Sequence, residues 1–115
     1  IMRHFKLWPD ETILHESMVT ADSGRDNLLL TLTSRKILLE KRKGIFKKDR
    51  EHIHSIDLHS IKIYYETPQI KQNGAIVEIQ STHSNLKLTF SDATEARKFS
   101  SKTIEAIIEK RSDPS

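Results

Sequence analysis

The residues best suited to chemistry in this sequence form one basic segment, residues 41–50. Its six bases surround an apolar pair, Ile45 and Phe46, and one acid, Asp49. The bases are Lys41, Arg42, Lys43, Lys47, Lys48 and Arg50. Such a segment attracts an anionic protein or acidic peptide, a nucleic-acid backbone, or an anionic membrane into which Ile45 and Phe46 would insert. The alternative is a solvated strand edge with Phe46 in the core.

The charge of the chain is concentrated in this segment. The whole chain has 19 Lys and Arg against 16 Asp and Glu, a net charge of +3. The segment alone carries +5, six bases less one acid, so the remainder carries −2, which is +3 less +5. The sequence therefore predicts a mildly acidic body with one basic projection, whose attraction for a partner is fast and salt-sensitive.

Histidine is the second residue type that could do chemistry here. On a regular strand His52 and His54 share one face, with His59 nearby, which is the beginning of a metal site. No carboxylate or cysteine is spaced to complete that site, so we expect solvent-facing histidines and no metal. The six His make chance combinations with Ser and Asp plentiful, and the three Gly are too scattered for a phosphate loop. We expect no catalytic residues, no cofactor and no enzyme activity.

Composition limits the class of protein further. A length of 115 residues with 36% hydrophobic residues fits one folded domain. The absence of cysteine excludes disulfides, cysteine-ligated zinc and iron–sulfur clusters. No apolar stretch approaches the roughly 18 residues of a membrane span, and the charged start does not resemble a signal peptide. We expect a soluble cytoplasmic domain, with the inner face of the membrane as the alternative location.

Alternating apolar and polar residues predict about seven short strands over the first ninety residues. Hairpin-length turns join them, among them residues 33–36, the tip at Gly44 and the pair Asn73-Gly74. Tyr64 and Tyr65 fall on opposite faces of one predicted strand, which predicts that one is buried and the other exposed.

The period changes near Ser91, where a capping box of Asp92 and Glu95 predicts the start of a helix. Its apolar face comprises Ala93, Ala96, Ser100, Thr103, Ile104 and Ile107, with Phe99 and Ile108 at the edges. We expect one amphipathic helix of about five turns that closes the end of an antiparallel sheet.

Three patches of sequence resemble the bacterial PH-like family, within the pleckstrin-homology and GRAM superfold. Residues 9–14 resemble its opening, with Asp10 where glycine is usual. Residues 30–39 resemble its strand–turn–strand signature, with Lys36 where arginine is usual. Residues 53–63, the two strands that follow and the helix resemble its second half in order and spacing. The resemblance covers about 100 residues.

The resemblance implies a mainly-β α+β fold: a seven-stranded antiparallel open barrel of two near-orthogonal sheets, capped by one C-terminal helix. It implies a non-enzymatic module that binds lipid headgroups, peptides or proteins. Lipid-binding relatives grip phosphates with bases at the first loop. Here that loop has Arg25 against Asp22 and Asp26 and the second strand has no base, so specific phosphoinositide binding is not expected.

The sequence therefore predicts an N-terminal arm at 1–9, a single PH-like domain at 10–111 and a polar tail at 112–115. The predicted function is an adaptor that docks an anionic protein or acidic peptide through the basic segment. The alternatives are binding to anionic lipid headgroups of a membrane and self-assembly into a homo-oligomer through an open sheet edge. Nucleic acid is the least favoured partner.

Overall fold

The computed structural model describes residues 9–21, 27–42, 50–82 and 85–112. Within these ranges the chain forms a seven-stranded antiparallel sheet and one C-terminal helix, which confirms the predicted fold class. The strands of this sheet are β1 (Ile13–Ala21), β2 (Leu28–Thr33), β3 (Lys36–Arg42), β4 (Arg50–Asp57), β7 (Ile70–Asn73), β8 (Ile76–Gln80) and β9 (Asn85–Thr89). Between β4 and β7 lie the 3₁₀ helix η1 (Leu58–Ser60) and the hairpin of β5 (Ile63–Tyr64) and β6 (Thr67–Pro68). The helix α1 spans Ala93–Ser112, so it includes the first residue of the predicted tail.

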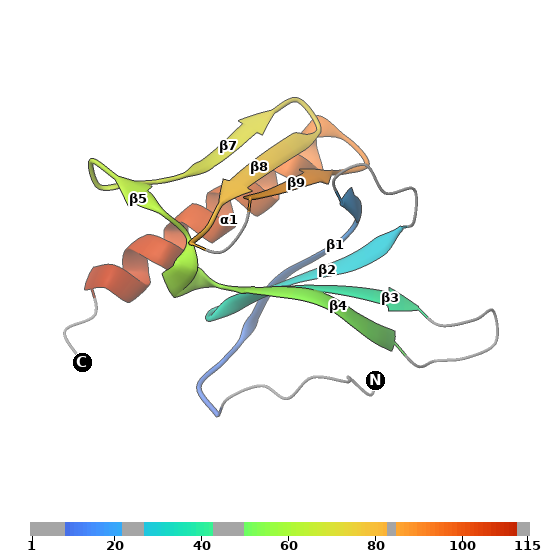
Figure 1. The fold of residues 1–115 in the computed structure, drawn as a ribbon, viewed down its shortest axis with the longest axis horizontal. Coiled ribbons are helices and arrows are strands. Elements are labelled where there is room, and N and C mark those ends of the chain that lie inside the picture. The colour runs from blue at the N-terminus through green and yellow to red at the C-terminus, as the bar shows by residue number, and fades with distance from the viewer. Residues whose placement is uncertain (1–8, 22–26, 43–49, 83–84, 113–115) are drawn as a thin grey trace.

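The central strand of the sheet is β1, which belongs to both of its halves. The strand order is β4-β3-β2-β1-β9-β8-β7. Its first part, from Ile13 to Val19, pairs with β2, and its last residues, Thr20 and Ala21, pair with β9. Figure 1 shows the consequence: β1–β4 form one layer, β7–β9 form a second, and α1 packs along the second layer. The barrel is open, with β4 and β7 as the edge strands of the described sheet.

The core lies between the two layers and α1. Leu30, Leu32, Ile37 and Leu39 fill it from β2 and β3, each with at most 1% of its surface exposed. From α1, Ala96, Phe99 and Ile107 of the predicted apolar face enter the same core, whereas Ile108, predicted at its edge, is 51% exposed. Phe99 is fully buried, and its ring centroid lies 5.2 Å from that of Phe90. No disulfide stabilises this core, because the chain has no cysteine.

The turn between β7 and β8 differs by one residue from the predicted pair. Asn73 pairs with Ile76, so the two loop residues are Gly74 and Ala75. Gly74 has φ +60°, a left-handed conformation that glycine adopts without a steric penalty. Glycine is favoured at the first position of such a two-residue loop, which accounts for the shift.

The tyrosine prediction is wrong, because the predicted strand breaks at Tyr65. Tyr65 and Glu66 form the loop of the β5–β6 hairpin, with φ of 52° and 67°. Both Tyr64 and Tyr65 are exposed, at 49% and 101%. A two-residue loop with positive φ at both positions normally carries Asn-Gly or Asp-Gly, so this turn is strained.

Replacing this loop by Tyr65→Asn with Glu66→Gly should relieve that strain. We expect the free energy of unfolding to rise by about 1 kcal/mol, because Asn and Gly adopt the left-handed conformation more readily than Tyr and Glu, and the larger chain entropy that Gly loses on folding offsets part of the gain. Urea denaturation measures the change. The matched control is Gly74→Ala, which places a methyl group in open space at φ +60° and should lower stability by a similar amount. Equal stability of all three proteins would contradict the strain.

Candidate functional site

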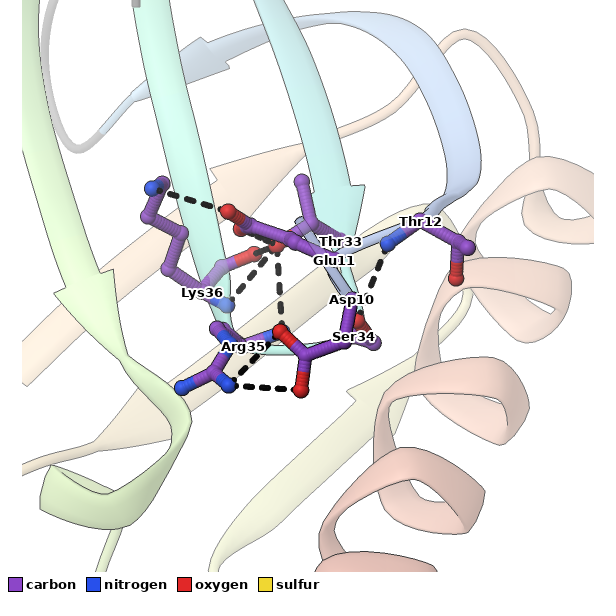
Figure 2. Close-up of polar contacts among 7 residues, drawn as sticks. All are labelled: Asp10, Glu11, Thr12, Thr33, Ser34, Arg35 and Lys36. Carbon is purple, nitrogen blue, oxygen red and sulfur yellow. Dashed lines mark hydrogen bonds and ion pairs between the residues drawn. The ribbon is translucent and has the colours of Figure 1, made fainter. Parts of the chain in front are cut away.

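Polar side chains gather where the segment before β1 meets the β2–β3 turn (Figure 2). We call this group the polar latch; it comprises Asp10, Glu11, Thr12, Thr33, Ser34, Arg35 and Lys36. Its centre is the buried hydroxyl of Thr33, which donates to Glu11 Oε2. Thr33 Oγ1 also accepts from the backbone N–H of Arg35 at 3.1 Å and from that of Lys36 at 3.0 Å. One threonine thus closes the turn and joins it to the segment before β1.

Two ion pairs complete the latch, one with a buried carboxylate and one exposed to solvent. The side chain of Glu11 is 0% exposed, and its Oε1 lies 3.3 Å from Lys36 Nζ. A buried carboxylate requires such partners, so this pair holds the segment tightly. Arg35 instead reaches both carboxylate oxygens of Asp10 at 2.8 Å, with the Asp10 side chain 72% exposed. Solvent weakens an exposed pair, which contributes little to stability.

The backbone closes the latch as well. Ser34 N–H donates to Thr12 O at 2.9 Å, and Thr12 N–H donates to Ser34 Oγ at 3.1 Å. Residues 9–14 and 30–39, two of the patches that carried the sequence resemblance, therefore meet here. Sequence reasoning picked them out as motifs but did not predict that they touch.

The contacts of the polar latch predict that a change at Thr33 destabilises the fold more than a change at Arg35. Thr33→Val keeps the shape of the side chain but leaves Glu11 and two N–H groups without their hydroxyl partner. We expect the free energy of unfolding to fall by about 2 kcal/mol. Arg35→Ala removes only the exposed pair and should lower it by less than about 1 kcal/mol. Chemical denaturation of the two variants tests the order, and a larger loss for Arg35→Ala would contradict it.

A second polar group, which sequence reasoning missed, joins β1 to α1. Asp92 caps the helix, since its Oδ1 accepts from the Glu95 N–H at 2.8 Å. The Glu95 carboxylate turns toward β1, where Ser17 Oγ donates to Glu95 Oε2 at 3.3 Å. Nε2 of His15 lies 3.3 Å from that oxygen, at ion-pair distance but outside hydrogen-bond geometry. Lys102 Nζ adds a bond to Leu14 O at 3.1 Å.

This group positions the helix and lacks the order of a catalytic triad. In a triad the imidazole stands between hydroxyl and carboxylate, whereas here His15 and Ser17 face the same oxygen of Glu95. Burial is the main cause that lowers the pKa of His15 from its ordinary 6.5. Glu95 acts in the opposite direction, and Lys102 and Lys98 lower the pKa further.

The lowered pKa of His15 predicts loss of stability in acid. The unfolded chain takes up the proton first, so the free energy of unfolding should fall as pH drops through 6.5. The fall should stop once the folded His15 is also protonated. His15→Gln should remove this component, while His59→Gln, at an exposed position, should keep it. Denaturation curves from pH 8 to 5 test this, and identical pH profiles for both variants would rule it out.

The described ends of the predicted basic segment, Lys41, Arg42 and Arg50, lie at the end of β3 and the start of β4. In the register Lys41 opposes Glu51 and Arg42 opposes Arg50, so the two ends of the segment are adjacent. Lys41 is partly buried. Lys43, Lys47 and Lys48, with the apolar pair Ile45 and Phe46, lie outside the described residues, as does the first loop at 22–26.

The regular alternation that was predicted to place His52 and His54 on one face of a strand is interrupted in β4. His54 opposes Leu39 while His52 opposes Glu40, so Ile53 is an extra residue and the alternation is interrupted between the histidines. His59 is exposed on η1. Within the described ranges no three His, Cys, Asp or Glu residues are grouped to hold a metal ion. No helix in these ranges is both long and apolar enough to cross a membrane.

Comparison with known proteins places this fold. No family model and no curated protein matches the sequence. Among solved structures, the human ARAP2 N-terminal PH domain matches with a TM-score of 0.62 at 14% identity, over 88% of this chain and 84% of that one. The DH/PH domains of PDZ-RhoGEF, in complex with activated RhoA, match with a TM-score of 0.66 at 12% identity, over 86% of this chain.

A structure of the Vav1 exchange factor with its PH and C1 domains matches with a TM-score of 0.61 at 17% identity, over 86% of this chain. The chain spans only 30% of the PDZ-RhoGEF chain and 26% of the Vav1 chain. Identities this low compare the fold alone. The antiparallel sheet bent at β1 and closed by α1 is the fold of a pleckstrin-homology domain.

Proposed function

We propose that this chain is a non-enzymatic binding module that docks an anionic protein or acidic peptide through the basic segment. The observation that carries the proposal is the register of β3 and β4, which pairs Arg42 with Arg50. Residues 43–49 therefore connect two adjacent strand ends. Three of the six bases, Lys41, Arg42 and Arg50, thus lie at the same end of the two strands, and the other three belong to the connecting segment, while the rest of the chain is mildly acidic.

The register supports the proposal energetically. Like charges placed directly opposite on neighbouring strands destabilise a sheet. The register opposes Arg42 to Arg50, next to the opposite-charge pair of Lys41 and Glu51, so like charges face each other at this one position of the strand ends. An anionic ligand relieves that repulsion and gains charge-assisted hydrogen bonds from the arginines. Binding of this kind is driven by long-range attraction and weakens as salt increases.

The fold supports a binding role in preference to catalysis. The PDZ-RhoGEF domains in the matched structure are in complex with RhoA, so a PH fold occurs there beside a protein partner. The His15, Ser17 and Glu95 group of this chain lacks the order of a triad. The sequence resemblance to bacterial PH-like proteins adds the same expectation of a binding module.

Reversing the basic segment tests the proposal. Lys41, Arg42, Lys47 and Lys48 are changed to Glu, and binding is measured to a labelled polyglutamate peptide and to vesicles of phosphatidylcholine with phosphatidylserine. We expect the parent to bind the peptide and the variant to bind it at least about tenfold more weakly. Binding by the parent should fall between about 50 and about 300 mM salt.

The matched control reverses four exposed bases elsewhere, Lys62, Lys71, Arg97 and Lys98, with the same change in net charge. It should retain peptide binding. Equal loss in both variants would show that net charge alone drives binding and would overturn the proposal. Binding of the parent to vesicles but not to peptide would favour the membrane alternative, and Ile45→Ser with Phe46→Ser would then test insertion.

A further inference from the structure

The turn between β7 and β8 carries the pair Asn73-Gly74, in which a side-chain amide precedes a glycine. Asn73 ends β7 and is exposed, and Gly74 begins the two-residue loop. A Cβ placed on Gly74 would meet nothing within 4 Å, so this side of the loop is open. The backbone nitrogen of Gly74 therefore follows the Asn73 amide with no side chain of its own to hinder an approach.

An amide in this position reacts with the next backbone nitrogen, which is one reason why asparagine is a thermolabile residue. The Gly74 nitrogen bonds to Cγ of Asn73, the bond from Cγ to Nδ2 breaks, and the proton of the Gly74 N–H leaves with Nδ2 as ammonia. The product is a five-membered imide. Water then opens the imide at Cγ, which gives Asp, or at the main-chain carbonyl carbon, which gives isoaspartate. Water is the only co-reactant.

The folded turn restrains this reaction. Ring closure requires rotation about the Cα–C bond of Asn73, whereas pairing with Ile76 keeps Asn73 extended. The side chain of Gln72 adds a second restraint, because its Nε2 donates to Gly74 O at 2.6 Å. The reaction therefore depends on local opening of the turn. β7 is an edge strand of the described sheet, so this opening breaks pairing on one side only.

We propose that Asn73-Gly74 is a site of spontaneous self-modification, and that the hydrogen bond from Gln72 limits how often the turn opens to react. Both products place a new carboxylate at the exposed end of β7. Isoaspartate also reroutes the main chain through Cγ, which lengthens it by one methylene group between residues 73 and 74.

The lengthened main chain changes the contacts of the turn. Asn73 pairs with Ile76 across a two-residue loop, and a loop of that length sets the register of its hairpin. On the far side of the loop, Ala75 O accepts from the N–H of the buried Phe90 at 2.7 Å. Figure 1 shows the end of β7 beside the segment that leads into α1. Isoaspartate at position 73 therefore loosens the connection between this hairpin and the start of α1.

The chain contains its own controls for the reaction. Its other two asparagines, Asn27 and Asn85, are also exposed, but each precedes a leucine. The intact chain is incubated in neutral buffer, and peptide mass spectrometry follows the conversion of each asparagine. We expect conversion at Asn73 to be at least about tenfold faster than at the other two, because only Asn73 precedes a residue without Cβ. Equal rates at the three positions overturn the proposal.

A variant at Gly74 separates the reaction from general unfolding. Gly74→Ala should lower stability, yet it adds a Cβ beside the attacking nitrogen. We expect conversion at Asn73 to slow at least about tenfold in this variant. Conversion at the parent's rate or faster would show that the reaction only follows unfolding, and would overturn the proposal.

A variant at Gln72 tests the restraint. Gln72→Ala should speed conversion at Asn73 about fivefold, the weight of one hydrogen bond in the opening equilibrium. The matched control is Gln69→Ala, which removes a similar bond outside the turn, from Gln69 Nε2 to Thr67 O at 3.1 Å. The control should convert at the parent's rate. Equal rates in the two variants would overturn the role of Gln72.

A second measurement tests the structural consequence. The aged chain is separated by charge, and isoaspartyl methyltransferase identifies the isoaspartate fraction. Asn73→Asp is the matched control, because it carries the same charge on an ordinary backbone, and it should unfold in urea near the parent's midpoint. We expect the isoaspartate fraction to unfold at a lower urea concentration. A midpoint equal to that of Asn73→Asp would contradict the loosening.

Discussion

The fold depends on one shared strand. β1 gives its first part to β2 and its last two residues, Thr20 and Ala21, to β9, so both layers are hydrogen-bonded to the same backbone. The layers cannot separate without breaking β1, and they cannot flatten because the pairing changes partner partway along it. The remaining open side exposes apolar surface, which α1 covers with Phe99 at the centre. The bend in β1 thus determines where the helix must lie and which of its residues are buried.

Contacts on β1 also fix the helix in rotation and along its axis. Glu95, one turn into α1, reaches Ser17, and Lys102, two turns later, bonds to the Leu14 carbonyl. These polar contacts lie at the border of the core, where the apolar packing of Phe99 against Phe90 gives most of the stabilisation but little directional specificity. Packing and polar contacts together give α1 one position on the sheet.

Sequence reasoning predicted the features that depend on local pattern. Alternation located β1 and β2, and the helical period located α1, because burial on one face produces both patterns. It failed where the outcome depends on contacts distant in the chain. Tyr65 continues an alternating pattern, yet the chain turns there, and the carboxylate of Glu95 bonds to β1 rather than closing the capping box. In the candidate site, the sequence predicted the charge of the basic segment. The pairing of Arg42 with Arg50 could be seen only from the strand register in the structure.

The extra residue at Ile53 has a consequence for the open edge of the barrel. β4 is eight residues long and pairs on one side with β3 alone within the described sheet, so it offers another chain a row of backbone donors and acceptors. A regular row of that length is a template for intermolecular pairing and aggregation. The register shift beside Leu39 divides the row into two short parts that are out of step with each other. An open barrel with this irregularity can remain monomeric without a covering strand.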